Sequence, residues 1–218
     1  MIWIDKVLND LSWWASSDWV VRGVFIVLIV ASVISWTIIL YKYWQISVIS
    51  RGENRLERLL FTYECTKGLS KLEKKGRPSG VLIRTLRKWK ASGLPKNRHG
   101  LEMEIAHSIR EQRIYLENGL TFLATIGSGA PFIGLLGTVW GIMHALSALD
   151  GVSTLTMDLV AGPVSEALVA TAVGLFTAIP AVMGYNMLVR KLRRVMATLE
   201  GIGLRLVNLF EKERQEAN

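Results

Sequence analysis

The sequence predicts an all-α membrane protein with three transmembrane helices that continue into long cytoplasmic helical extensions. Half of the 218 residues are hydrophobic, and they gather in three long stretches that carry almost no charge. The charged residues gather between these stretches, and most of them are basic. Apolar stretches of spanning length that alternate with basic segments are typical of a polytopic membrane protein.

The first transmembrane helix is predicted at residues 19–44. No charged residue lies between Arg22 and Lys42, and about 18 apolar residues suffice to cross a bilayer. Tryptophan and tyrosine residues gather at both ends of this stretch, in the headgroup zone that aromatic side chains prefer. Before it, the apolar residues of segment 1–18 share one face, which predicts an amphipathic helix on the periplasmic surface.

The second and third transmembrane helices are predicted at residues 119–147 and 161–189. Each lies in a region of more than thirty residues without charge, apart from Glu166 in the third. At about 1.5 Å per residue, both regions exceed a hydrocarbon core of about 30 Å. We therefore expect both helices to tilt, to kink or to project into water.

The distribution of lysine and arginine predicts the orientation. Segment 45–118 holds sixteen of them and the tail 190–218 holds seven, whereas the loop 148–160 holds none. The positive-inside rule then places the N-terminus and this loop in the periplasm, and the two basic segments in the cytoplasm. Because topology alone accounts for this basic charge, we do not expect the protein to bind nucleic acid.

Both basic segments are predicted to be helical next to the membrane. In segment 45–118, apolar residues share one face of a helix that runs into the second transmembrane helix: Leu101, Ile105, Ile109 and Leu116. In the tail 190–218, apolar residues recur in steps of three and four, as in a coiled-coil seam: Leu192, Val195, Leu199, Ile202, Leu206 and Leu209. We expect the second and third helices to extend beyond the membrane.

Small residues follow one face of the second transmembrane helix, and Gly174 stands in a similar face of the third. The glycines concerned are Gly127, Gly134, Gly137, Gly141 and Gly174. In lipid, such faces allow close backbone approach, and packing contacts then hold the helices together. The sequence predicts tight helix packing at these glycines and leaves open whether it occurs within a subunit, between subunits or both.

Three polar residues in the apolar stretches are candidates for function. Glu166 is an acid in the third stretch, where an ionised carboxylate is costly unless it has a partner. Alternatively, it lies at the outer interface in the first helical turn after Pro163. Thr138 and Thr171 are flanked by small residues that leave room beside their hydroxyls, although membrane threonines often bond their own backbone. Together these three side chains could line a sparse polar path.

No catalytic constellation is present in the sequence. It contains no phosphate-binding glycine loop, no zinc-protease motif and no Cys/His metal spacing. Cys65 is its one cysteine, so paired thiolate ligands cannot form within a chain. We therefore expect neither enzymatic activity nor a metal or other cofactor.

Two long motifs resemble the ExbB/TolQ/MotA proton-channel family. They are ATIGSGAPFIGLLGTVWGIMHAL at residues 124–146 and VAGPVSEALVATAVGLFTAIPAVMGYN at residues 160–186. The resemblance implies a multi-pass protein of the bacterial inner membrane. It also implies a homopentamer around two copies of a single-span, ExbD/TolR-like partner that carries an essential aspartate. It makes Thr138, Glu166 and Thr171 the residues that line the proton pathway.

Within the family, the resemblance favours the ExbB type, which with TonB energises transport across the outer membrane. The motif VAGPVSEALVATA resembles this type. The motifs GIMHAL, with His144, and PAVMGYN resemble the TolQ type, which acts with TolA in outer-membrane constriction at division. The MotA type is disfavoured because its longer cytoplasmic torque region is not found. A non-conducting membrane scaffold for a partner protein is the alternative from another class.

Overall fold

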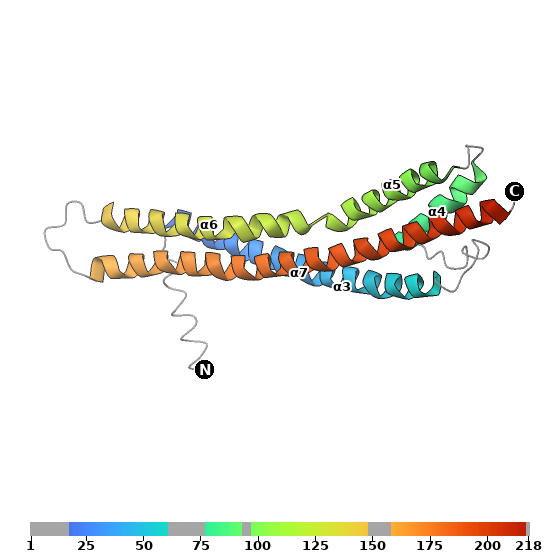
Figure 1. Cartoon of the computed structure of the whole chain (residues 1–218). Helices are drawn as coiled ribbons and strands as arrows, with labels where there is room; N and C mark the ends of the chain where they lie inside the picture. The colour runs from blue at the N-terminus through green and yellow to red at the C-terminus, as the bar shows by residue number, and fades with distance from the viewer. Residues whose placement is uncertain (1–17, 61–76, 93–96, 148–157, 217–218) are drawn as a thin grey trace. The chain divides into compact units, whose positions relative to one another are not determined.

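The computed structural model describes residues 18–60, 77–92, 97–147 and 158–216, and the regular structure within them is entirely α-helical (Figure 1). The described residues form five helices, in chain order α3 (Trp19–Leu60), α4 (Pro78–Ala91), α5 (Arg98–Glu117), α6 (Leu120–Ser147) and α7 (Asp158–Glu216). Residues 1–17 of the predicted amphipathic helix and residues 148–157 of the predicted loop lie outside the described residues.

Among the described helices, α3, α6 and α7 are long and apolar enough to cross a membrane. In their most apolar 18-residue windows, 28%, 33% and 39% of the residues are buried. Many large apolar side chains of these helices, such as Ile26, Phe132 and Phe176, are exposed and available to lipid or to other subunits. A water-soluble protein rarely exposes so much contiguous apolar surface. In the described residues, the predicted all-α fold is confirmed, as are three helices long and apolar enough to span a membrane.

Helices α3 and α7 are longer than the predicted transmembrane segments, whereas α6 nearly coincides with its predicted segment. Helix α3 continues to Leu60, well past residue 44, and α7 runs without a break from Asp158 to Glu216. The pentamer and the cytoplasmic location of the helical extensions stay predictions.

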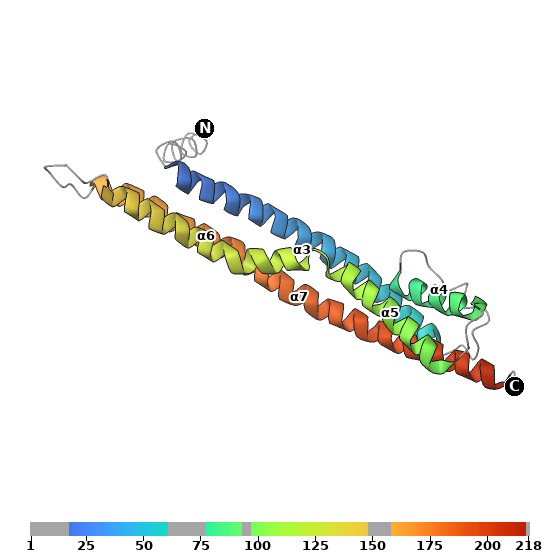
Figure 2. The same ribbon diagram turned by 90° about the horizontal axis from the view of Figure 1, so that it is seen from above.

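The first of two compact units contains residues 18–39, 121–147 and 158–185 among those described. It consists of the start of α3, almost all of α6 and the first part of α7. Helices α6 and α7 lie side by side in both views (Figures 1 and 2). All three helices supply residues to the core, which contains Val21, Val24, Phe25, Leu28, Ala130, Ala170 and Ala178. Because the residues from α6 and α7 are alanines, these two helices can approach closely.

A hydrogen bond to Asp18 joins two helices of this unit. The backbone carbonyl of Asp18 accepts from the amide of Arg22 at 3.0 Å and so begins the first turn of α3. Its carboxylate accepts from the indole Nε1 of Trp140 on α6 at 2.5 Å. The start of α3 is therefore fixed to α6 by a side chain that had no predicted role.

The second unit contains residues 40–60, 77–92, 97–120 and 186–216 among those described. Helix α4 packs against α5 in this unit (Figure 2). The predicted seam in the tail is buried at every position: Leu192, Val195, Leu199, Ile202, Leu206 and Leu209. Ile105 of α5 packs where Gly203 of α7 has no side chain, because a Cβ there would lie 2.8 Å from Ile105 Cγ2.

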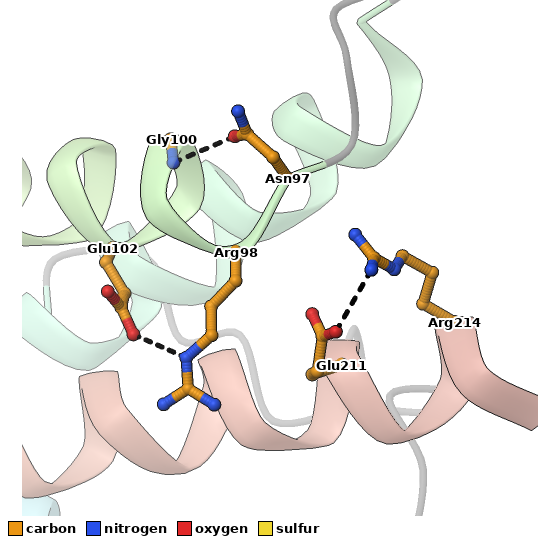
Figure 3. Close-up of polar contacts among 6 residues, drawn as sticks. All are labelled: Asn97, Arg98, Gly100, Glu102, Glu211 and Arg214. Atoms are coloured by element: carbon orange, nitrogen blue, oxygen red, sulfur yellow. Dashed lines mark hydrogen bonds and ion pairs between the residues drawn. The ribbon is translucent and has the colours of Figure 1, made fainter.

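Polar contacts fix the ends of helices in the same unit (Figure 3). Asn97 caps α5 by accepting from the amide of Gly100 at 2.9 Å, which satisfies one of the free N–H groups of the first turn. Arg98 pairs with Glu102 at 2.8 Å one turn along α5, and Arg214 pairs with Glu211 at 3.3 Å near the end of α7.

Helix α5 does not run into α6, so the predicted continuous helix is wrong at this point. The chain breaks at Asn118 and Gly119, and Gly119 has a φ of 88°. This left-handed conformation ends a helix and costs glycine little because it has no Cβ. The carbonyl of Leu116, near the end of α5, accepts from Nζ of the buried Lys42 at 3.2 Å.

Candidate functional site

The candidate site lies where α6 and α7 approach at backbone distance. A Cβ added to Gly134 would lie 2.8 Å from the carbonyl oxygen of Ala170 and 3.0 Å from the Cα of Thr171. A Cβ added to Gly174 would lie 2.7 Å from the carbonyl oxygen of Ala130. Real Cβ atoms essentially never come so close to backbone atoms. The two glycines therefore let the two backbones touch.

The other small residues extend this contact along both helices. Gly141 faces the Cβ of Ala167, and Gly137 faces the Cβ of Ala170 together with Val24 of α3. Gly127 lies against Val182. In the structure of a single chain, the small face of α6 thus packs mainly against α7 of the same chain.

Thr138 and Thr171 meet beside this backbone contact. The hydroxyl of Thr171 donates to the hydroxyl oxygen of Thr138 at 3.5 Å, and Thr138 donates to the carbonyl of Leu135 at 2.8 Å. The first distance is at the outer limit for a hydrogen bond, whereas the second is the usual length for a hydroxyl donor. Thr138 is 7% exposed and Thr171 is half-buried. The two hydroxyls form a short polar chain that ends on the backbone of α6.

Glu166 lies on α7, five residues before Thr171, and is half-buried. Five helical residues correspond to about 7.5 Å along the axis and about 140° around it. Within the described part of the chain, no hydrogen bond connects Glu166 to either threonine. The structure therefore brings together two of the three predicted residues and places the carboxylate on another side of α7.

Two further hydroxyl groups in the first unit were not predicted as functional. Ser35 on α3 is 1% exposed and Thr177 on α7 is 2% exposed. Neither hydroxyl has a hydrogen-bond partner among the described residues. Nothing in the sequence distinguishes them from lipid-facing threonines and serines, because burial of a hydroxyl depends on how the helices are rotated.

The chemistry available at the threonine pair is limited to hydrogen bonding. Neutral hydroxyls both donate and accept, so they can order a water molecule or the side chain of a partner. The described residues contain no group of three or more metal-binding side chains. The threonine pair therefore offers hydrogen-bond donors and acceptors and carries no charge of its own.

Residues 81–201 match the MotA/TolQ/ExbB proton channel family. This segment covers more than half of the chain and includes Thr138, Glu166 and Thr171. The chain belongs to this family.

Its relatives include both ExbB and TolQ proteins. The biopolymer transport protein ExbB of Neisseria meningitidis serogroup A is 34% identical over 88% of this chain and 94% of its own length. The Tol-Pal system protein TolQ of Haemophilus influenzae is 37% identical over 83% of this chain and 84% of its own length. ExbB of Salmonella typhimurium is 31% identical over 94% of this chain and 88% of its own length. These similarities extend over nearly the whole length of each protein.

Proposed function

We propose that this chain is the proton-channel and stator subunit of an ExbB-type motor in the bacterial inner membrane. With an ExbD-like single-span partner, it uses the proton motive force to energise TonB-dependent transport across the outer membrane. The observation that carries the proposal is the hydrogen-bonded pair of Thr138 and Thr171 beside the backbone contact of α6 and α7. Membership of the family supports it.

In the proposed mechanism, an aspartate on the partner helix carries the proton. An ionised carboxylate is costly in the membrane interior, so it stays near hydroxyl groups until it is protonated. The threonine pair supplies such groups among otherwise smooth walls of glycine and alanine. One proton moving down 100 mV releases about 2.3 kcal/mol, enough to bias the position of a helix in the pore.

The proposed assembly is a homopentamer with a periplasmic N-terminus and a cytoplasmic C-terminus. The basic segments 45–118 and 190–218 support this orientation by the positive-inside rule. The large apolar side chains exposed on all three spanning helices support contacts with lipid and with further subunits.

Replacement of Thr171 by valine tests the proposal. T171V keeps the shape of the side chain and removes its hydroxyl, so proton-dependent uptake of a ferric siderophore should be abolished while the complex still assembles. T171S is the matched control, because it keeps the hydroxyl, and it should retain most of the uptake. Co-purification of the partner reports assembly in both variants. Normal uptake by T171V would contradict the proposal.

The alternative from another class is a non-conducting scaffold. Replacement of Glu166 distinguishes this scaffold from the motor in the same uptake assay. An E166A variant that assembles with its partner but loses uptake favours the motor. An E166A variant with normal uptake favours the scaffold, because a scaffold requires no protonatable group in the third apolar stretch.

The second candidate is a TolQ-type subunit for outer-membrane constriction at division. It is favoured by the identity of 37% to the Haemophilus influenzae TolQ. Complementation distinguishes the two types. An ExbB-type chain should restore siderophore uptake to a strain that lacks ExbB, and a TolQ-type chain should restore outer-membrane integrity to a strain that lacks TolQ.

A further inference from the structure

A cationic surface lies on one side of α3, past the end of its apolar stretch. Its members are Arg51, Asn54, Arg55 and Arg58, which we name the arginine face. All four side chains are exposed, and they line an open cavity of about 410 Å³. In a helix this spacing confines them to an arc of about 100°.

The acidic residues of this part of α3 point elsewhere and do not neutralise the arginine face. Glu53 is completely buried and accepts from the backbone amide of Ser79 on α4. Glu57 lies against Gly201 of α7, because a Cβ added to this glycine would be 3.1 Å from Oε1 of Glu57. The acidic and the basic side chains therefore lie on different sides of α3.

No carboxylate pairs with any arginine of this face in the part of the chain that the structure describes. Other arginines of the same unit do have acidic partners one turn away. Arg98 pairs with Glu102 and Arg214 with Glu211 (Figure 3). Like charges at a spacing of four residues destabilise a helix, so an anion bound at the arginine face would stabilise this part of α3.

The position of the arginine face along α3 favours a protein partner over a lipid headgroup. The uncharged stretch between Arg22 and Lys42 is about as long as the hydrocarbon core, so Lys42 marks its inner edge. Arg51 is then about 14 Å beyond that edge and Arg58 about 24 Å beyond it. The headgroup layer is about 5–8 Å thick on each side. Headgroups would end before Arg58, even on a tilted helix.

We propose that the arginine face binds an acidic segment of a partner protein, one that presents aspartate or glutamate side chains at helical spacing. The planar guanidinium binds a carboxylate through two parallel N–H donors, so three arginines in a row match three carboxylates on a facing turn. This interaction goes beyond the proposed function, because it requires neither proton conduction nor the threonine pair.

The test measures the binding of a labelled peptide to the full-length protein in nanodiscs of phosphatidylcholine. The peptide carries glutamates at every third or fourth position, and its fluorescence anisotropy reports the Kd. The triple variant R51Q/R55Q/R58Q should weaken binding by about tenfold or more. The matched control is R98Q/R113Q/R214Q, which removes the same charge from arginines that have acidic partners and should leave the Kd nearly unchanged.

Three results would overturn the proposal. Equal weakening by both triple variants would mean that the peptide senses only net charge. Loss of wild-type binding in nanodiscs that contain phosphatidylglycerol would mean that lipid occupies the arginine face. A changed subunit number in native mass spectrometry of R51Q/R55Q/R58Q, but not of the control, would assign the face to a contact between copies of this chain.

Discussion

At the scale of single residues, the contact between α6 and α7 depends on glycines, which have no side chain to hold the two backbones apart. Gly134 and Gly174 each place a hydrogen atom where any other residue would place a carbon within 3 Å of backbone oxygen. Backbone atoms cannot move away as the end of a flexible side chain can. A methyl group at either position would push the helices apart and lengthen the bond between Thr138 and Thr171, which is already 3.5 Å.

This argument gives a prediction for Gly134, with Gly129 as its control on the same helix. A Cβ on Gly129 would meet nothing within 4 Å. We expect G134A to destabilise the fold by about 1–3 kcal/mol through overpacking. G129A should be neutral or stabilising by up to about 1 kcal/mol, because alanine is the better helix former. Melting of the purified protein in detergent, followed by tryptophan fluorescence, measures both effects.

Equal melting temperatures for G134A and G129A would show that α6 and α7 do not touch at Gly134. Loss of stability in G129A alone would place the main contact of α6 on the opposite face.

The sequence predicted these residues only in part. The spacing of the glycines by three and four was sufficient to predict a face for close packing, because helical periodicity depends on sequence alone. It was not sufficient to predict that Thr138 and Thr171 touch, which depends on how far each helix is rotated and shifted. The same limit explains why the buried hydroxyls of Ser35 and Thr177 were not recognised.

At the scale of elements, the start of α4 depends on a side chain from another helix. The N-cap residue of α4 is Arg77, whose side chain makes no capping hydrogen bond. The first residues of the helix, Pro78, Ser79 and Gly80, are nevertheless buried. Glu53 of α3 supplies an acceptor, since its Oε1 lies 3.5 Å from the amide nitrogen of Ser79. A carboxylate at this position also favours the positive end of the helix dipole.

We therefore expect E53A to loosen the first turn of α4. Loss of a cap costs about 1 kcal/mol, so the amides of Ser79 and Gly80 should exchange with deuterium roughly fivefold faster. E216A is the matched control, because Glu216 is exposed near the end of α7 and pairs with Lys212 of the same helix. Hydrogen exchange with mass spectrometry measures both variants. Unchanged exchange in E53A would mean that packing alone fixes α4.

No pattern in the sequence predicted this contact. Glu53 is one of several charged residues in segment 45–118, and charged residues there are expected on the surface. Its complete burial follows from the way α4 folds back onto α3, a long-range contact that local periodicity does not encode. The unpartnered Oε2 of Glu53 shows that this burial is not fully compensated within the described residues.

At the scale of the whole molecule, the fold class follows from composition along the chain. The three spanning helices could be predicted because hydrocarbon tolerates few charges over about 20 residues, and α3, α6 and α7 satisfy this rule. The number of subunits could not be derived from residue patterns, since the exposed apolar side chains suit lipid and neighbouring subunits equally. The family supplies that expectation.

The orientation gives a prediction that involves the entire chain. In a C65S background, S147C at the outer end of α6 should react with a membrane-impermeant maleimide added to intact spheroplasts. A91C at the end of α4 should react only after the membrane is permeabilised, because segment 45–118 is basic and is expected in the cytoplasm. Both positions are exposed, so burial does not protect them. The reverse labelling pattern would invert the topology.

The left-handed backbone at Gly119, with its φ of 88°, also restricts which substitutions this position can accept during evolution. Point mutations of a glycine codon supply alanine, valine, serine, glutamate or arginine, among others, and each of these brings a Cβ into a conformation that L-residues avoid. Among the products of a single base change, aspartate tolerates the left-handed region best. Asparagine also tolerates this region better than most residues, but it requires a second base change. Natural variants of this chain should therefore keep glycine between α5 and α6, with aspartate as the most accessible substitute.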